Sequence, residues 1–148
     1  MKITDALLGE HALLYAQFDY LQQATPAAET LAVVHSLAAG LTATLASHAH
    51  LEDELLFSTL DPYLGPMGPL AVMRMEHDQI EGLLGQVPAA QELDQAQRLL
   101  QQAVQVARSH FAKEEQVLFP MALQVLEQSK LAALAAQWAE RRGVHLLR

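Results

Sequence analysis

Two segments of the chain share one pattern: HAHLEDELLF, which begins at His48, and HFAKEEQVLFP, which begins at His110. In each segment the first histidine precedes a glutamate, Glu52 or Glu114, by four residues. Residues four apart lie one turn apart on the same face of an α-helix. The pattern therefore predicts two helices, each of which presents one imidazole and one carboxylate to the same side.

The repeated unit is longer than these segments, because each segment follows a Glu-His pair that begins an apolar helical pattern. His11 precedes His48 by 37 residues, and His77 precedes His110 by 33 residues. The chain therefore contains a unit of two histidines and one glutamate that occurs twice. A doubled set of imidazoles and carboxylates, facing inward from helices, predicts a site for two metal ions.

The composition of the 148-residue chain favours a single all-α domain over residues 1–148. Apolar residues make up 51% of the chain but aromatic residues only 5%, so the core is built mainly from aliphatic residues that favour helices. The net charge of −8 and the absence of a Lys/Arg cluster argue against nucleic acid as a partner. The chain has no cysteine, which excludes disulfides, thiolate metal sites and a cysteine nucleophile.

The chain starts without the apolar segment and cleavage site of a signal peptide, so we expect a cytoplasmic protein. Residues 30–51 contain no Asp, Glu, Lys or Arg and are long enough to span a bilayer. Their serines, threonines and histidines would be costly in hydrocarbon. We therefore expect a helix with a wide buried face and no membrane partner.

Apolar periodicity and helix-breaking residues predict an up-down-up-down four-helix bundle with a short C-terminal fifth helix. Thr25 and Pro26 predict the start of the second helix, and Ser129 predicts the start of the tail helix. Pro120 lies inside the fourth helical pattern and predicts a kink or an end there. The bundle core covers about residues 4–128. The expected helices cover residues 4–23, 26–59, 69–85, 89–128 and 129–143, and residues 61–69 form a connection without helix.

In such a bundle, four imidazoles and two carboxylates point into an apolar interior. A buried carboxylate without a partner is costly, and binding a metal ion is one of the few ways to keep it. Imidazole and carboxylate ligands without thiolate suit iron, manganese or zinc, and carboxylates can bridge two ions. Coordination positions remain open to oxo, hydroxo, water or an added small molecule, which favours a redox or gas-binding centre. The candidate ligands are His11, His48, Glu52, His77, His110 and Glu114.

Other histidines have simpler interpretations, because a lone histidine on an apolar face is usually a hydrogen-bonded core residue. His50 and Glu54 are also four residues apart, but they lie about 200° around the helix from His48. They are expected to form a surface pair, with His50 in place of His48 as the alternative. His35 and His145 have no counterpart in the repeat and are assigned no role.

Two further pairs of residues occupy matching positions in the repeat. Asp53 and Glu115 directly follow the two candidate glutamate ligands, and either could support a ligand through a hydrogen bond. Phe57 and Phe119 are expected to wall the site and to limit the access of solvent.

The complete pattern resembles the hemerythrin-like family of HHE cation-binding domains, over about residues 5–126. The order Glu-His, His-x-x-x-Glu, Glu-His and His-x-x-x-Glu-Glu-x-x-Leu-Phe-Pro carries the resemblance. The resemblance implies a four-helix bundle with a non-haem di-iron centre, in which the six candidate ligands hold two iron ions joined by an oxo or hydroxo bridge. It also implies that Glu52 and Glu114 bridge the two irons.

The chain departs from the oxygen-carrying hemerythrins at two places. Their third helix has a further histidine one turn after its ligand, where this chain has Glu81, which is either a seventh ligand or a surface glutamate. Their last carboxylate lies five residues after the last histidine, whereas Glu114 lies four residues after His110. Tyr15, one turn after His11, is either a core tyrosine or a group that contacts bound oxygen species or iron.

The higher share of carboxylate favours peroxide or NO chemistry, or iron sensing, over reversible oxygen carriage. The leading hypothesis is a small di-iron protein that binds O2, peroxide or NO. The alternatives are an enzyme that consumes peroxide or NO, and an iron or oxygen sensor without catalysis. The sequence leaves open the physiological ligand, the metal that is loaded and the oligomeric state.

Overall fold

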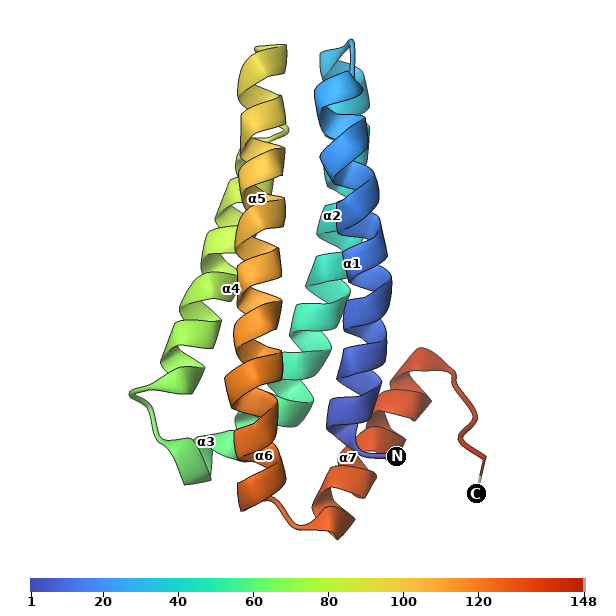
Figure 1. Cartoon of the computed structure of the whole chain (residues 1–148), viewed down its shortest axis with the longest axis vertical. Coiled ribbons are helices and arrows are strands. Elements are labelled where there is room, and N and C mark those ends of the chain that lie inside the picture. Colours follow the sequence, from blue (N-terminus) through green and yellow to red (C-terminus); the bar gives the residue numbers. More distant parts are fainter. Residues whose placement is uncertain (148) are drawn as a thin grey trace.

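The computed structural model describes residues 1–147, and every regular element in this part of the chain is a helix. The prediction of an all-helical protein is therefore confirmed. α1 and α4 run in one direction along the long axis, and α2 and α5 run in the other (Figure 1). Each of these helices packs against at least two of the others. Their bounds are α1 Ile3–Ala27, α2 Leu31–Glu52, α4 Pro69–Gln86 and α5 Leu93–Lys113.

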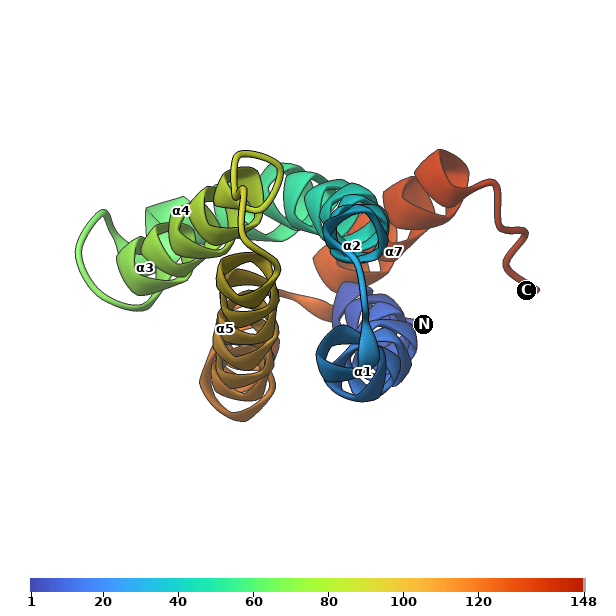
Figure 2. The same cartoon turned by 90° about the horizontal axis from the view of Figure 1, so that it is seen from above.

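The other elements gather at one end of the molecule (Figure 1). α2 and α5 each continue through a π-helical turn, η1 or η2, into a short helix, α3 or α6. The tail helix α7 packs against α1 and η1, on the outer side of α1 and α2 (Figure 2). Their bounds are η1 Asp53–Phe57, α3 Ser58–Leu64, η2 Glu114–Leu118, α6 Phe119–Val125 and α7 Gln128–Arg142.

The boundary between the first two helices differs from the prediction. α1 continues through Pro26 to Ala27, and α2 begins at Leu31. Thr30, and not Thr25, is the N-cap, because its hydroxyl accepts the backbone N–H of Val33 at 3.3 Å. α1 tolerates Pro26 because the helix ends one residue later, so the missing N–H affects only the final turn.

The predicted connection at residues 61–69 is also shorter than expected. α3 runs through Pro62 to Leu64, and α4 begins at Pro69. Gly65 ends α3 with a φ of 75°, a positive value that favours glycine. The turn is further held by Arg74 of α4, which donates two hydrogen bonds to the carboxylate of Asp61 in α3, at 2.8 and 2.9 Å.

The fourth predicted helix starts later and passes its proline. α5 begins at Leu93 instead of residue 89, and α6 continues past Pro120 to Val125, so an end at Pro120 is wrong. The π-helical turn η2 ends at Leu118, two residues before the proline, and changes the hydrogen-bond register, with the N–H of Phe119 bonded to the carbonyl of Glu114. The tail helix begins at Gln128 and not after Ser129.

The buried apolar residues form two clusters, one along the upper part of the four long helices and one at the end that carries α3, α6 and α7. On α1, His11 lies between Leu7 of the lower cluster and Leu14 of the upper cluster. The same order holds on α2 and α4, and along the continuous segment of α5 and η2, where Glu114 lies between Phe111 of the upper cluster and Leu118 of the lower cluster. The candidate ligands therefore form a polar layer between two apolar ones.

The segment Leu31–Leu64 is long and apolar enough to cross a membrane, judged by length and composition alone. The core helix of a water-soluble bundle has the same properties. In the structure this segment carries His48 and Glu52, both buried against the other long helices. The expectation that the protein has no membrane partner stays a prediction.

Candidate metal centre

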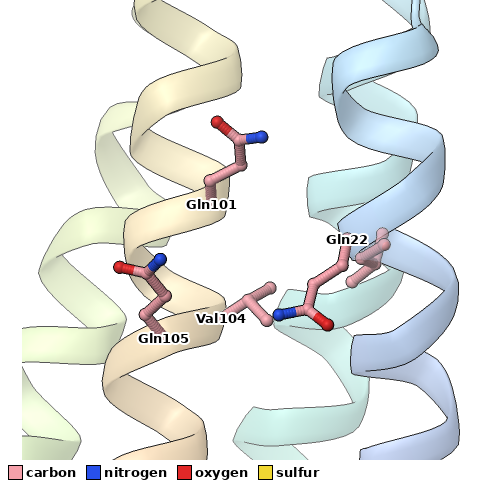
Figure 3. Close-up of a pocket in the computed structure, with 5 residues that line it drawn as sticks. Gln22, Gln101, Val104 and Gln105 are labelled. Atoms are coloured by element: carbon pink, nitrogen blue, oxygen red, sulfur yellow. The ribbon is translucent and has the colours of Figure 1, made fainter.

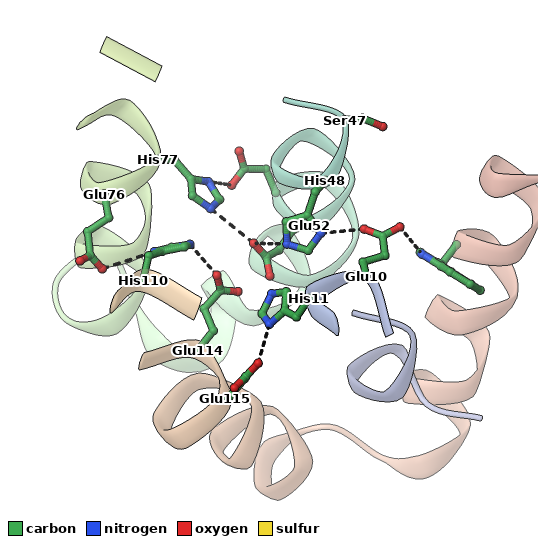
Figure 4. A network of polar contacts seen from close by, with 12 residues as sticks. Glu10, His11, Ser47, His48, Glu52, Glu76, His77, His110, Glu114 and Glu115 are labelled. Atoms are coloured by element: carbon green, nitrogen blue, oxygen red, sulfur yellow. Dashed lines mark hydrogen bonds and ion pairs between the residues drawn. The ribbon is translucent and has the colours of Figure 1, made fainter. Parts of the chain in front are cut away.

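Six side chains meet in the polar layer between the two apolar clusters (Figure 4). They form two overlapping groups, and within each group every residue offers one ligand atom within 4.8 Å of the others. Glu52 and Glu114 belong to both groups. His11 and His48 complete the first group, and His77 and His110 complete the second. The structure thus brings together all six residues that the sequence repeat singles out.

The atoms that face one another in this layer have no hydrogen-bond partner of good geometry, although some lie at ion-pair distance: His110 Nε2 is 2.5 Å from Glu114 Oε1, and His77 Nε2 is 3.4 Å from Glu52 Oε2. Seven atoms of the layer are buried without a hydrogen-bond partner: Nε2 of His11, His48 and His110, and both carboxylate oxygens of Glu52 and Glu114. Leaving buried polar atoms unsatisfied costs about 1–3 kcal/mol each. Imidazole nitrogen and carboxylate oxygen are donors for iron, manganese and zinc, so these atoms fit one or more cations placed among them.

The two glutamates lie where an α-helix changes into a π-helical turn. Glu52 is the last residue of α2, directly before η1, and Glu114 is the first residue of η2. The backbone N–H of Asp53 and that of Glu114 are each shared between two carbonyls of the preceding helix. At the end of each turn, a backbone N–H bonds to the carbonyl five residues earlier, from Ser58 to Asp53 and from Phe119 to Glu114. π-helical turns occur mostly as single turns inside α-helices, and they are frequent at functional sites. Here the two turns begin within one residue of matching positions in the two copies of the repeat.

Each of the four histidines directs its other ring nitrogen, Nδ1, toward a carboxylate (Figure 4). This arrangement orients the ring and leaves Nε2 facing the centre. In a neutral imidazole whose proton is on Nδ1, the lone pair of Nε2 is available to a metal ion. The partner is always on another helix or turn. The Nδ1-to-oxygen distances are 2.6 Å for His48 and Glu10, 3.0 Å for His11 and Glu115, and 3.4 Å for both His77 and Asp53 and His110 and Glu76.

Sequence reasoning proposed Asp53 and Glu115 as supporting residues but assigned no role to Glu10 and Glu76. Both glutamates directly precede a candidate ligand, and both bond the histidine of the following long helix. The repeated Glu-His pair was the available signal. Neighbouring residues point about 100° apart on a helix, so helical geometry alone places a glutamate beside a buried histidine on a different face and does not indicate a role for it.

Aromatic rings cover the imidazoles. Phe111 stacks on His11 with ring centroids 3.9 Å apart, and Phe119 lies against the same ring at 5.5 Å. Phe57 stacks on His77 at 5.4 Å. All three phenylalanines are buried, so the predicted walls at Phe57 and Phe119 lie against the site, and Phe111 adds a third wall.

The part of the chain that carries these residues matches a known protein family. The family model described as the hemerythrin HHE cation-binding domain matches residues 2–122. The chain belongs to this family. The match includes all six converging side chains and ends before α7. Searches of curated proteins and of solved structures found no match. Membership in the hemerythrin family implies that the chain binds cations, in agreement with the donor set.

Two residues that the sequence left with alternative roles, Glu81 and Tyr15, lie outside both groups. Glu81 is exposed on α4, which fits the surface alternative. The ring of Tyr15 is half-buried, and its edge faces His11 with centroids 6.4 Å apart. His50 is 74% exposed and pairs with Glu54 at 3.0 Å, as expected for a surface pair. Neither His35 nor His145 joins the two groups formed by the described residues.

A cavity of about 300 Å³ borders the centre between α2 and α4. Three histidines of the centre, His48, His77 and His110, contribute to its lining, and its other walls include Leu45 and Ile80. The cavity therefore lies directly beside the candidate metal centre. Another cavity, of about 280 Å³, lies between α1 and α5 (Figure 3). Its lining has no imidazole or carboxylate and consists of Leu21, Gln22, Gln101, Val104 and Gln105.

The charges of the centre depend on one another. Burial and the neighbouring Glu114 carboxylate raise the pKa of Glu52 to about 7, and burial raises the pKa of Glu114 to about 7. Burial and the nearby His48 lower the pKa of His11 to about 3. Burial also lowers the pKa of His77, but contacts with Asp53 and Glu52 outweigh it and raise the value to about 10. Protons and a cation therefore compete for the same atoms.

This competition predicts that cation affinity falls on acidification. A carboxylate with a pKa of about 7 is mostly ionised at pH 8 and mostly protonated at pH 6. Competition with one such proton lowers the affinity about 10-fold between these values, and more if several protons leave. Titration of the hemerythrin-family chain with Zn2+ at pH 8 and pH 6, with proton release measured in two buffers, tests this. Equal affinities at both values would contradict it.

Proposed function

We propose that the chain is a non-haem di-iron protein that binds O2, peroxide or NO. The observation that carries the proposal is the pair of overlapping groups with two shared carboxylates. His11 and His48 would hold one iron, His77 and His110 the other, and Glu52 and Glu114 would contact both. An iron pair supplies reversible electron transfer to small oxidants when it is bound.

The residues of the chain prepare such a centre in three ways. The Nδ1 partners orient the imidazoles, and the carboxylate charge offsets that of the cations. Phe57, Phe111 and Phe119 exclude water from the buried side. The cavity between α2 and α4 leaves the opposite side accessible, so a small ligand reaches the centre without opening the helices.

The proposal includes the architecture and the setting of the centre. The four long helices form an up-down-up-down bundle, α7 is its fifth helix, and residues 1–148 are one hemerythrin-like domain. We propose a cytoplasmic protein whose partners are small diatomic molecules or peroxide, and not nucleic acid. The apolar layers on both sides of the centre support a single folding unit, because α1, α2 and α4 each contribute residues to both clusters.

The iron content of purified protein tests the proposal. After anaerobic loading with Fe2+ and removal of free metal, we expect two irons per chain for the wild type. His110→Ala should lose iron from the second group, whereas His35→Ala, which changes a half-buried histidine elsewhere on α2, should retain both irons. Equal iron loss in the two variants, or stoichiometric zinc without iron after iron-replete expression, would contradict the assignment.

The accessible cavity also favours a second function, the consumption of peroxide or NO. The carboxylate-rich donor set and the position of Tyr15 near His11 motivate it. Peroxide and NO electrodes would measure consumption by the iron-loaded protein against the same concentration of free iron. Binding without consumption above free iron would favour a carrier or sensor.

A further inference from the structure

The helix α7 lies beyond the part of the chain that matches the family, yet it reaches the candidate metal centre. Trp138 and Arg142 are four residues apart and lie on the same face of α7. Trp138 donates its indole N–H to Glu10 Oε1 at 2.8 Å, and Arg142 Nε donates to the same oxygen at 2.6 Å. The other oxygen, Oε2, accepts the Nδ1–H of His48 at 2.6 Å (Figure 4).

Arg142 also binds the helix that carries His48. Its Nη1 donates to the hydroxyl of Ser47 at 2.6 Å, and its Nη2 donates to the Ser47 carbonyl at 3.3 Å and to Glu10 Oε2 at 3.2 Å. One guanidinium therefore joins α7 to both α1 and α2, directly beside a histidine of the first group. Glu10 is only 13% exposed, so its charge is compensated chiefly by these donors.

The repeat shows why this contact is needed in one half of the molecule. In the second copy, Glu76 supports His110 and accepts a hydrogen bond from Lys113 Nζ at 2.6 Å. Lys113 lies three residues after His110. The matching position, three residues after His48, is Leu51, which is buried in the lower apolar cluster. The first copy thus lacks a cation of its own beside the supporting glutamate.

In both groups, a Lys or Arg side chain compensates the charge of one supporting carboxylate. In each group, one histidine is supported by a carboxylate that has a Lys or Arg partner: Glu10 with Arg142, and Glu76 with Lys113. The other supporting carboxylates, Glu115 and Asp53, form no ion pair with Lys or Arg in residues 1–147. Arg142, from a distant part of the chain, therefore supplies Glu10 with the cationic partner that Lys113 supplies to Glu76 and that Leu51 cannot supply.

We propose that α7 completes the cation centre, with Trp138 and Arg142 as positioning residues that hold Glu10 and, through it, His48. This inference rests on the proposed function. With both donors present, the Glu10 carboxylate is fixed in one orientation, and His48 directs Nε2 at the first group. Without them, Glu10 can turn toward solvent, and the His48 ring loses its support. The effect is confined to the first group, since Glu76 and Lys113 support the second.

Binding of Co2+ to the full-length protein tests the proposal, because bound Co2+ shifts the N–H proton signals of ligand imidazoles in NMR spectra. We expect the wild type to bind two Co2+. Arg142→Gln should weaken one of the two binding steps about 10-fold, at the lower end of the loss of about 10- to 100-fold that is typical of groups supporting a metal ligand, and leave the second unchanged. One exchangeable imidazole N–H signal, that of His48, should exchange faster with water. Trp138→Phe should act in the same direction.

Three comparisons make the test specific. Arg141→Gln removes the neighbouring arginine, which pairs with Glu54 at the surface, and should leave both binding steps unchanged. Arg142→Lys keeps the charge and should restore part of the affinity. Lys113→Met should weaken the other binding step, because Lys113 holds Glu76 in the second group.

The outcomes separate this inference from the proposed function. The role of α7 would be overturned if Arg142→Gln and Trp138→Phe both bind two Co2+ with wild-type affinity and show the wild-type rate of N–H exchange. The di-metal proposal would then still stand. Equal weakening of both steps would also overturn the role of α7, because it would reflect general destabilisation. A wild type that binds no Co2+ would overturn both. If Arg142→Gln does not fold, Trp138→Phe decides by the same criteria, because it keeps the aromatic ring.

Discussion

Saturation with Fe2+ under anaerobic conditions is expected to raise the melting temperature of the protein by about 10 °C or more. A ligand present at 1,000 times its Kd stabilises the native state by about 4 kcal/mol per site, and 1 kcal/mol corresponds to about 2–4 °C in a domain of this size. The effect should be large because the centre joins all four long helices. Without a cation, the burial of the Glu52 carboxylate and its repulsion by Glu114 oppose folding.

Differential scanning calorimetry with Fe2+ and with a chelator measures this shift. His35→Ala should show the same shift as the wild type, because His35 is not part of the centre. Identical melting temperatures with and without iron would contradict a centre that ties the helices together. They would also remove the physical basis for a sensor that acts through stability.

Glu114→Gln is expected to abolish tight iron binding and at the same time stabilise the iron-free protein at pH 8. Glu114 belongs to both groups, so its loss affects both irons, whereas His11→Ala affects only the first group. A rise of the pKa from 4.5 to about 7 corresponds to roughly 3 kcal/mol of destabilisation of the fold by the ionised carboxylate. An amide of similar shape removes that charge.

The pH dependence gives the sign of the stability effect. Because the pKa of Glu114 is raised in the folded state, its protonated form favours folding below about pH 4.5, and this contribution is lost as pH rises through about 7. Urea unfolding of iron-free wild type should therefore show lower stability at pH 8 than Glu114→Gln, with a smaller difference at pH 5. A variant that retains two irons, or that is less stable at pH 8, would contradict this role.

The parts of the molecule that depend on local spacing could be predicted from the sequence. The i, i+4 relation between His48 and Glu52, and its repetition at His110 and Glu114, follows from helical geometry alone. The apolar periodicity likewise indicated helices throughout, and the repeat brought His11 and His77 into the same set. The structure places all of these side chains in one layer.

The parts that depend on tertiary packing could not be predicted. Glu10 reaches His48 only because α1 and α2 pack with those residues at the same height, and it meets Arg142 across 132 positions of sequence. The π-helical turns are another example, because no local propensity distinguishes them from α-helix. They explain why the helix passes Pro120, where a proline in an uninterrupted α-helix would be disruptive.

Anomalous diffraction at the iron edge, from crystals of the iron-loaded protein, tests the di-iron proposal most directly. We expect two peaks about 3.5–4 Å apart, as in other two-metal sites, with Glu52 and Glu114 contacting both and with one histidine pair beside each. A single peak, or peaks away from these six side chains, would contradict the proposed centre.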